Sequence, residues 1–234
     1  MQALKVAALT LAFLGAITVR AAAQDGTDVD LALVLSADAS GSIDETEFAL
    51  QREGIASAIT DPEVMAAIKS GRHGRIAVTL VEWGSPGAPV QVVGWHVGGE
   101  ERLQDFAMDV RNAPRAQLSY NAIGDGMALG AALIAACPCK PIRKVIDVSG
   151  DNPDMRSNLP APMARDLAVK AGITVNALAI LQDDRLGPNG RPWLVEVYEQ
   201  TVIGGFGAFV IPARTRTDFA RALRQKLIQE IAMR

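Results

Sequence analysis

The chain has 234 residues, a formal net charge of −3 at pH 7 and 49% hydrophobic residues. This length and composition predict a single domain with an ample hydrophobic core. The mildly acidic balance argues against nucleic acid and anionic membranes as binding partners.

The first 23 residues are predicted to be a secretory signal peptide. Lys5 gives it a positive start, an apolar run covers residues 6–19, and a small-residue cleavage motif ends at Ala23. The run is too short to span a bilayer comfortably, although Arg20 leaves an uncleaved membrane anchor open as an alternative.

Cleavage near Ala23 would leave a short segment over residues 24–28 and one domain over residues 29–234. No later segment is long and apolar enough for a transmembrane helix. We therefore expect an exported protein, periplasmic or secreted, with no stable membrane insertion of the mature chain.

Strand and helix patterns alternate along this domain. Strands are expected over residues 30–36, 75–83, 90–97, 142–149, 173–181 and 208–211. Helices are expected over residues 44–60, 100–112, 121–136, 161–171, 193–202 and 217–233. The loop between the second and third strands is too short for a parallel crossover, so that pair should be antiparallel. The sequence thus predicts an α/β fold, a doubly wound and mostly parallel six-stranded sheet with one antiparallel edge strand and helices on both faces.

The first strand ends in three oxygen-bearing side chains. Five aliphatic residues over 31–35 predict a buried strand, and Asp38, Ser40 and Ser42 follow it at alternating positions. Carboxylate and hydroxyl oxygens that converge between a strand and a helix suit a hard divalent cation such as Mg²⁺.

A second acid should lie beside this motif. In a doubly wound sheet, the first strand pairs with the first strand of the second half, and ligands bind beyond their carboxyl ends. Here the second strand of that pair is 142–149, and Asp151 follows it. The topology therefore predicts that Asp38 and Asp151 meet in space.

These residues resemble the metal-ion-dependent adhesion site of von Willebrand factor A-type domains. Asp38, Ser40 and Ser42 match its D-x-S-x-S motif, and Asp151 matches its last acid. Asn121 stands where family members typically have Thr. The resemblance extends from about residue 28 to the C-terminus and includes exported bacterial members of the family.

The resemblance implies a binding function. Ser40 and Ser42 would bind the cation directly, Asn121 would take a third position directly or through water, and Asp38 and Asp151 would lie nearby and balance the charge. Mg²⁺ is the first expectation, with Ca²⁺ or Mn²⁺ as alternatives. A carboxylate from a protein partner would fill the open coordination position, so no catalytic residue is implied.

Each candidate ligand also has a structural interpretation. Ser42 and Glu45 fit a capping box for the first helix, and Asn121 fits the N-cap of a later helix. Asp151 fits a turn with the Asn-Pro pair that follows it.

Two other functions remain open. One is a phosphate-handling hydrolase with Asp38 as the nucleophile, although Ser40 occupies the position where such enzymes usually carry a second acid. The other is a scaffold that binds no metal. A catalytic triad is disfavoured, because neither His73 nor His96 has an obvious nucleophile beside it.

The two cysteines, Cys137 and Cys139, are separated by one proline. In an oxidising compartment they could form a local disulfide or remain as two thiols. A zinc site is disfavoured, since the chain offers only two histidines as further soft ligands.

Overall fold

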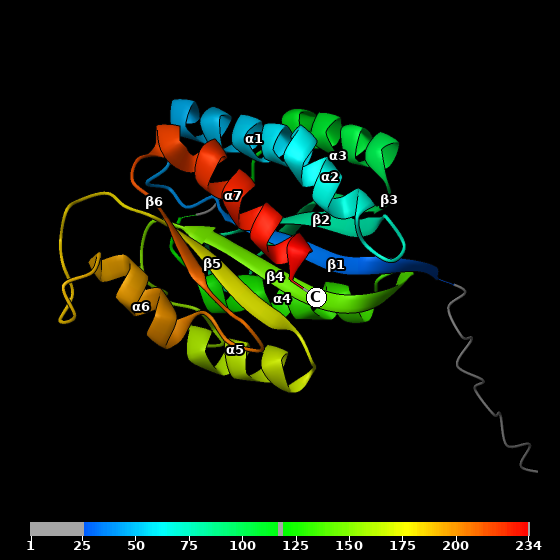
Figure 1. Ribbon diagram of the computed structural model, residues 1–234. Helices are drawn as coiled ribbons and strands as arrows, with labels where there is room; N and C mark the ends of the chain where they lie inside the picture. Colours follow the sequence, from blue (N-terminus) through cyan, green and yellow to red (C-terminus); the bar gives the residue numbers. More distant parts are fainter. Residues whose placement is uncertain (1–25, 117–118, 234) are drawn as a thin grey trace, which may run out of the picture.

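The computed structural model describes residues 26–116 and 119–233, so the predicted signal peptide lies outside the described residues. A six-stranded sheet has the strand order β3-β2-β1-β4-β5-β6 (Figure 1). The strands are β1 (Thr27–Asp38), β2 (Ile76–Trp83), β3 (Val90–Gly98), β4 (Cys139–Gly150), β5 (Thr174–Ile180) and β6 (Val210–Ala213). The α-helices are α1 (Glu45–Ile59), α2 (Pro62–Lys69), α3 (Glu100–Asn112), α4 (Ile123–Ala135), α5 (Ala161–Lys170), α6 (Trp193–Thr201) and α7 (Phe219–Ala232), with a 3₁₀ turn, η1 (Arg216–Asp218), before the last.

The pairing of the strands confirms the predicted architecture. β1 is parallel to both β2 and β4, and β5 continues the parallel order to β6. Only β3 runs antiparallel, against β2 at the edge of the sheet. The carboxyl ends of β1 and β4 therefore lie side by side in the middle of the sheet.

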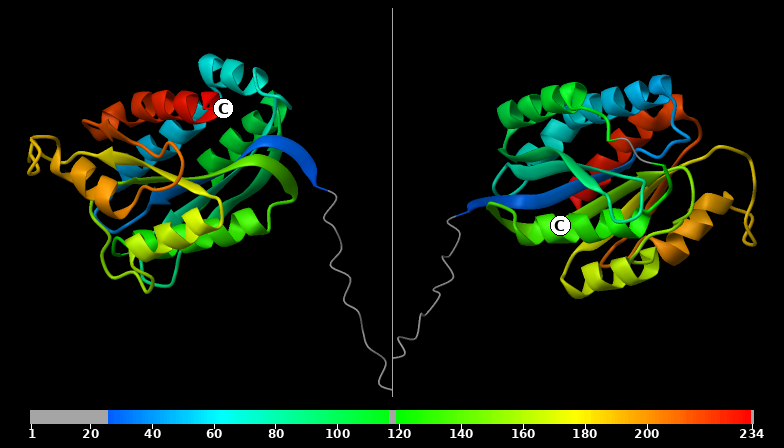
Figure 2. Two further views of the ribbon diagram at one scale, coloured as in Figure 1. Left: turned by 60° about the horizontal axis from the view of Figure 1, so that its bottom comes forward. Right: turned by 180° about the vertical axis from the view of Figure 1, so that it is seen from behind.

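Helices cover both faces of the sheet. Helices α1, α2, α3 and α7 lie over one face, and α4, α5 and α6 lie over the other (Figures 1 and 2). Successive residues of β1 point to opposite faces of the sheet. Leu33 belongs to the core beneath α1 and α7, and Val34 belongs to the core on the side of α4. Within the described residues, no helix is long and apolar enough to cross a membrane.

Several boundaries differ from the sequence prediction. β1 and β4 both start earlier than expected, because Thr27 and Cys139 already pair across the two strands. β6 lies two residues later than expected, where Val210 pairs with Ala177 of β5. Helix α2 was not predicted, although Asp61 caps it and Pro62 occupies its first turn.

Cys137 and Cys139 form a disulfide, which resolves the alternative left open by the sequence. Cys137 follows the end of α4 and is buried against Val29 and Ala32 of β1. The disulfide therefore closes the connection between α4 and β4 at the amino end of the sheet.

An ionic cluster is buried between α7 and the sheet. Lys226 of α7 lies 2.6 Å from Asp147 of β4 and 2.5 Å from Glu230, one turn further along the helix. Asn176 of β5 also donates to Glu230, at 2.7 Å. Burial raises the pKa of Asp147 to about 8, and Glu230 adds to the rise, while Lys226 opposes it.

The variant Lys226→Met tests the importance of this cluster. Removing its ammonium leaves two buried carboxyls without a positive partner, which should lower the free energy of unfolding by about 3–5 kcal/mol at pH 8. Urea denaturation measures the change, and the loss should shrink at pH 5, where the buried Asp147 carboxyl can take up a proton.

The matched control is Lys69→Met. Lys69 pairs with Glu100 on the surface, with about half or more of each side chain exposed. Its replacement should cost less than about 1 kcal/mol. Equal losses in the two variants would contradict a special role for the buried cluster.

Candidate functional site

The turn after β1 places hydroxyl and carboxyl oxygens next to one another. The Ser40 N–H donates to Asp38 Oδ1 at 2.8 Å, which folds the turn back on the end of the strand. The Ser40 and Ser42 hydroxyls lie 3.1 Å apart. Asp38 and Ser40 are buried, whereas Ser42 is exposed, so the group of oxygens opens to the surface on the Ser42 side.

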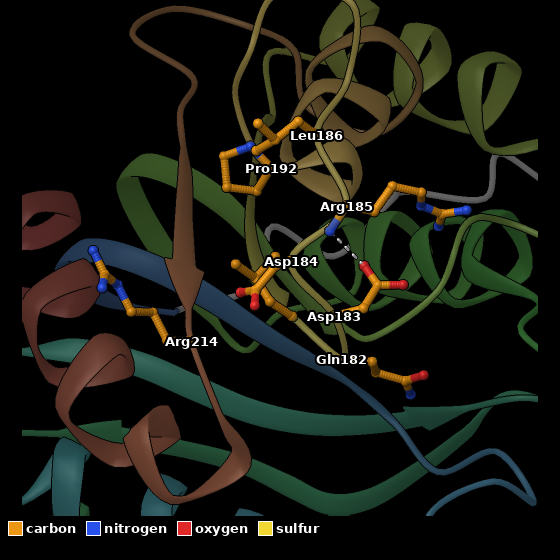
Figure 3. Close-up of a pocket in the computed structure, with 8 residues that line it drawn as sticks. Gln182, Asp183, Asp184, Arg185, Leu186, Pro192 and Arg214 are labelled. Carbon is orange, nitrogen blue, oxygen red and sulfur yellow. Dashed lines mark hydrogen bonds between the residues drawn. The ribbon is translucent and has the colours of Figure 1, made fainter.

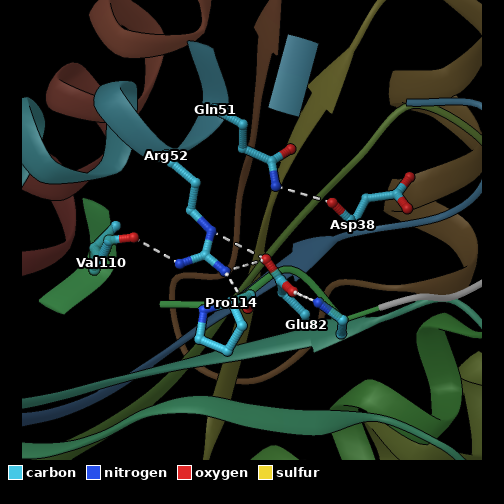
Figure 4. Close-up of polar contacts among 7 residues, drawn as sticks. Asp38, Gln51, Arg52, Glu82, Val110 and Pro114 are labelled. Atoms are coloured by element: carbon cyan, nitrogen blue, oxygen red, sulfur yellow. Dashed lines mark hydrogen bonds and ion pairs between the residues drawn. The ribbon is translucent and has the colours of Figure 1, made fainter. Parts of the chain in front are cut away.

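Neighbouring elements hold this turn from three sides. Gln51 of α1 donates to the Asp38 carbonyl at 2.9 Å (Figure 4). The Ala39 N–H donates to the carbonyl of Trp83 at the end of β2. Arg115, from the segment between α3 and α4, donates to the carbonyls of Ser40 and Ile43. The polar side chains are thus presented by a fixed backbone.

The Asp38 carboxyl is buried without full hydrogen bonding. Its Oδ2 receives no hydrogen bond. Asp151 interacts with it closely enough to shift its titration, so the predicted meeting of the two acids is confirmed. Burial first, and the charge of Asp151 second, raise the pKa of Asp38 to about 8, while hydrogen bonds from Ser40 oppose the rise.

Asp151 directly follows β4 and is positioned by two amides. Its Oδ1 accepts from Asn152 at 2.8 Å, and its Oδ2 accepts from Gln182 at 2.7 Å. Gln182 lies just after β5, so side chains beyond three strands of the sheet converge here. The local turn interpretation of Asp151 therefore covers its contact with Asn152 and misses the one with Gln182, which comes from elsewhere in the chain.

Asn121 does not cap a helix. Helix α4 begins after Ala122, and no side chain caps it. The Asn121 side chain is buried, and its Oδ1 receives no hydrogen bond. Backbone hydrogen bonds fix its position, from Met155 to the Asn121 carbonyl and from Ala122 to the Gly84 carbonyl. It lies at the same edge of the sheet, but no direct hydrogen bond links it to the other four candidates.

The capping box expected for Ser42 and Glu45 is wrong. Asp44 is the N-cap of α1, and its side chain accepts the Glu47 N–H while Glu47 accepts the Asp44 N–H. The box lies two residues further along because Ser40 and Ser42 belong to the turn that packs on β2. Ser42 is therefore not used as a helix cap.

A buried ion pair positions the segment that leads to Asn121. Arg52 of α1 pairs with Glu82 of β2 at 2.6 Å and also donates to the Val110 and Pro114 carbonyls (Figure 4). Glu82 accepts the Ala116 N–H at 2.8 Å. This pair fixes the residues that carry Arg115 over the turn after β1.

Two carboxylates organise the loops around the site, and the sequence analysis did not identify them. Asp125, in the first turn of α4, accepts backbone N–H groups of Gly87, Asn158 and Leu159. Asp154 accepts the N–H groups of Gly124 and Ala161. The position of Asp125 in the first turn of a helix was the available signal, but four of the five N–H donors lie thirty or more residues away from the carboxylate that accepts from them.

Two large aromatic side chains form the floor of the site. Trp83 and Tyr198 are fully buried, and the Tyr198 hydroxyl donates to the Asn152 carbonyl at 2.8 Å. A Cβ atom at Gly150 would lie 2.7 Å from the Tyr198 hydroxyl and 2.8 Å from the Trp83 ring. Glycine is therefore required at the last residue of β4, directly before Asp151. Burial and the charges of Asp38 and Asp151 hold the pKa of Tyr198 well above its usual value, so its hydroxyl stays a donor.

A cavity of about 520 Å³ lies next to the site, under the loop that follows β5. Gln182, Asp184, Leu186, Pro192 and Arg214 contribute to its lining (Figure 3). A smaller hollow of about 110 Å³ reaches from this loop to Asp151. Because Gln182 lines both spaces and also holds Asp151, the cavity is an extension of the candidate site.

The donor set favours a hard cation over a soft one. Carboxyl, hydroxyl and amide oxygens make up the five candidates, without nitrogen or sulfur donors. No group of three or more His, Cys, Asp or Glu side chains suited to a metal occurs among residues 26–116 and 119–233. A metal here would therefore rest on two acids together with neutral oxygens.

Comparison with known proteins assigns the family. Residues 28–234 match the family described as "Protein of unknown function (DUF1194)". The chain belongs to this family. No curated protein matches it.

Solved structures with the same fold include von Willebrand factor A domains. The pilus adhesin SpaC of Lactobacillus rhamnosus GG is similar at a TM-score of 0.61 and 16% identity, over 88% of this chain and 31% of that chain. Proximal thread matrix protein 1 of the mussel byssus, "with zinc occupied MIDAS motif", gives a TM-score of 0.59 and 14% identity, over 88% and 46%. A von Willebrand factor type A protein of Catenulispora acidiphila gives 0.57 and 15%, over 87% and 43%.

These similarities show that the DUF1194 chain has a von Willebrand factor A-type fold. The chain spans about a third of SpaC and under half of the other two proteins. At these identities the similarity concerns the fold, so the function of the site has to be argued from its own residues.

The titration of Asp38 predicts how stability depends on pH in the absence of metal. Its pKa of about 8 in the folded protein lies above its ordinary value of 3.8, so between these two pH values the folded state holds a proton that the unfolded chain has released. Stability should fall as the pH rises from about 4 to about 8, and Asp38→Asn should reduce that fall. Urea denaturation at pH 5 and pH 8, with a chelator present, gives the free energy of unfolding of the wild type and the variant. If stability fell as steeply with pH in Asp38→Asn as in the wild type, the assignment would be contradicted.

Proposed function

We propose that this DUF1194 protein is an adhesion-type binding module that captures an acidic group of a protein partner through a divalent cation. The observation that carries the proposal is the buried Asp38 carboxyl, which faces Asp151 and has one oxygen without a hydrogen bond. Two buried carboxyls in contact are costly unless a proton or a cation lies between them.

The same chain provides an internal comparison. Where Asp147 and Glu230 are buried together, Lys226 supplies the positive charge from within the protein. Asp38 forms no ion pair with a lysine or arginine of the described residues. A cation from solution is the simplest source of the missing charge.

Asp38, Ser40, Ser42, Asn121 and Asp151 would hold this cation. The buried Oδ1 of Asn121, which lacks a donor, supports this role, because a metal would satisfy it where no protein group does. The bound ion would neutralise the acid pair and offer a coordination position to an outside carboxylate. Mg²⁺ suits the oxygen donors best, with Ca²⁺ or Mn²⁺ as alternatives.

The similar adhesin structures support a protein as the partner, and they do not bear on its carboxylate. SpaC is a pilus adhesin, and a further neighbour is the von Willebrand factor domain of the pilus tip protein Mfa5 of Porphyromonas gingivalis, at a TM-score of 0.57 and 10% identity. The requirement for a carboxylate comes from the charge of the site, since the open position of a hard cation favours an anionic oxygen.

Export is part of the proposal. The predicted leader over residues 1–23 would direct the domain over residues 29–234 out of the cytoplasm, to a periplasm or the medium. The Cys137–Cys139 disulfide supports this, because disulfides persist in oxidising compartments.

A hydrolase that uses Asp38 as nucleophile fits less well. The side chain is fully buried, and burial raises its pKa to about 8, so at neutral pH without metal it is largely protonated. A nucleophilic carboxylate has to be ionised and accessible to the substrate. We therefore assign the site to binding and not to catalysis.

Calorimetric titration of the chelator-treated protein with Mg²⁺, Ca²⁺ and Mn²⁺ tests the proposal. We expect saturable binding of about one ion per chain, loss of binding in Asp38→Ala, and an affinity at least about tenfold lower in Asn121→Ala. Asn121→Thr should retain binding, because a hydroxyl can replace the amide oxygen.

The control variant is Asp28→Ala, which removes an exposed acid from the opposite end of the same strand. It should bind the metal as the wild type does. A wild-type protein that binds none of the three ions would favour the metal-free scaffold and overturn the proposal.

A further inference from the structure

Arg156 has an unusual backbone conformation for its residue type. Its φ is 65°, and the other positive-φ residues in the described parts of the chain are all glycines. A side chain disfavours this conformation, and such departures tend to persist where function requires the side chain. Glycine would relieve the strain at this position, so the question is what the arginine does.

The fold does not use the Arg156 side chain to hold its own loop. Asp154 fixes the start of the loop by accepting from Gly124 and Ala161, and Asp125 fixes its end by accepting from Asn158. Arg156 itself is exposed. Its guanidinium lies 4.7 Å from the centre of the Tyr120 ring, and it forms no ion pair with the described residues.

The Tyr120–Arg156 pair lies beside the candidate metal site. Tyr120 precedes Asn121, and the neighbouring Met155 donates its N–H to the Asn121 carbonyl at 2.7 Å. Tyr120 and Met155 are 41% and 48% exposed, so this rim of the site is open to a partner.

A second arginine has the same arrangement on another loop. Arg185 is exposed, and its guanidinium lies 3.3 Å from the centre of the Trp193 ring. It lies three residues after Gln182, whose amide holds Asp151. In Figure 3 its side chain points away from Asp184 and Leu186, and Arg185 lines the neighbouring cavity together with them. It too forms no ion pair within the described part of the chain.

Stacking prepares both arginines for anion binding. An aromatic ring under a guanidinium reduces its freedom and leaves the N–H groups at its edge available. Those N–H groups match the two oxygens of a carboxylate. Both groups are positive charges on a chain whose net charge is −3.

We infer that Arg156 and Arg185 are two anion-binding arms beside the metal site, and that they bind further carboxylates of the same partner. The inference rests on the proposed function and adds the partner's chemistry, which is a protein segment with several Asp or Glu side chains. One carboxylate would reach the cation, and neighbouring ones would bind the arms. An isolated acid would use the metal alone.

Two fluorescein-labelled peptides provide the test, one of six aspartates and one of a single aspartate among five asparagines. Fluorescence anisotropy in the presence of Mg²⁺ measures the affinity for each peptide. The six-aspartate peptide should bind at least roughly tenfold more tightly than the single-aspartate peptide. Arg156→Gly and Arg185→Gln should each reduce this advantage about threefold or more, without changing the affinity for Mg²⁺ or for the single-aspartate peptide. Because glycine accepts the left-handed conformation, Arg156→Gly should keep or raise the urea midpoint.

The control is Arg72→Gly, an exposed arginine in the turn before β2, at the opposite end of the sheet. It should bind both peptides as the wild type does. The inference would be overturned if the wild type bound the two peptides equally well. It would also be overturned if both arm variants kept the full preference for the six-aspartate peptide. In either case, Mg²⁺ binding would still support the proposed function.

Other outcomes separate the two proposals further. If the wild type bound no Mg²⁺, both the proposed function and this inference would be wrong. Arginine-dependent capture on phosphatidylserine vesicles, with no binding of the six-aspartate peptide, would point to a lipid surface and would also overturn the inference.

Discussion

The parallel pairing of β1 with β4 is the constraint on which the rest of the structure depends. Its register aligns Ala37 with Ser149, so the residues that follow each strand emerge at the same edge of the sheet. Asp38 and Asp151 are thereby brought into contact in a buried position. Neither strand can shift by one residue without turning its buried aliphatic side chains to the wrong layer, so the core itself keeps the two acids together.

The loops around the acids are held mainly by carboxylates that accept backbone N–H groups. Asp125 and Asp154 connect the start of α4 to the segment before α5, and Glu82 connects the end of β2 to the segment before α4. Each of these carboxylates accepts hydrogen bonds from backbone amides or pairs with an arginine, so it is not available to bind a metal. Asp38 differs because one of its oxygens receives nothing, and this difference separates the candidate site from its supports.

The two buried acid pairs show two solutions to the same electrostatic problem. Under α7, an internal lysine pairs with both Asp147 and Glu230 and binds the helix to the sheet. At the edge of the sheet, the Ser40 and Ser42 hydroxyls follow Asp38 in the same turn, and Arg156 and Arg185 lie over aromatic rings on neighbouring loops. The first arrangement is self-contained, whereas under the proposed function the second would be completed by a cation and an acidic partner.

Sequence patterns determined the alternation of strands and helices, the antiparallel edge strand and the positions of Asp38, Ser40, Ser42 and Asp151, because hydrophobic periodicity and strand order are local or topological properties. Only the tertiary structure decided that Asp44 caps α1, that Asn121 leaves its side-chain oxygen free of hydrogen bonds, and that Arg156 adopts a left-handed conformation. The partners of Asp125 and Lys226 likewise could not be predicted from the sequence. Each of these features depends on hydrogen bonds, ion pairs or packing between distant segments, and a local pattern carries no information about which distant group will be the partner.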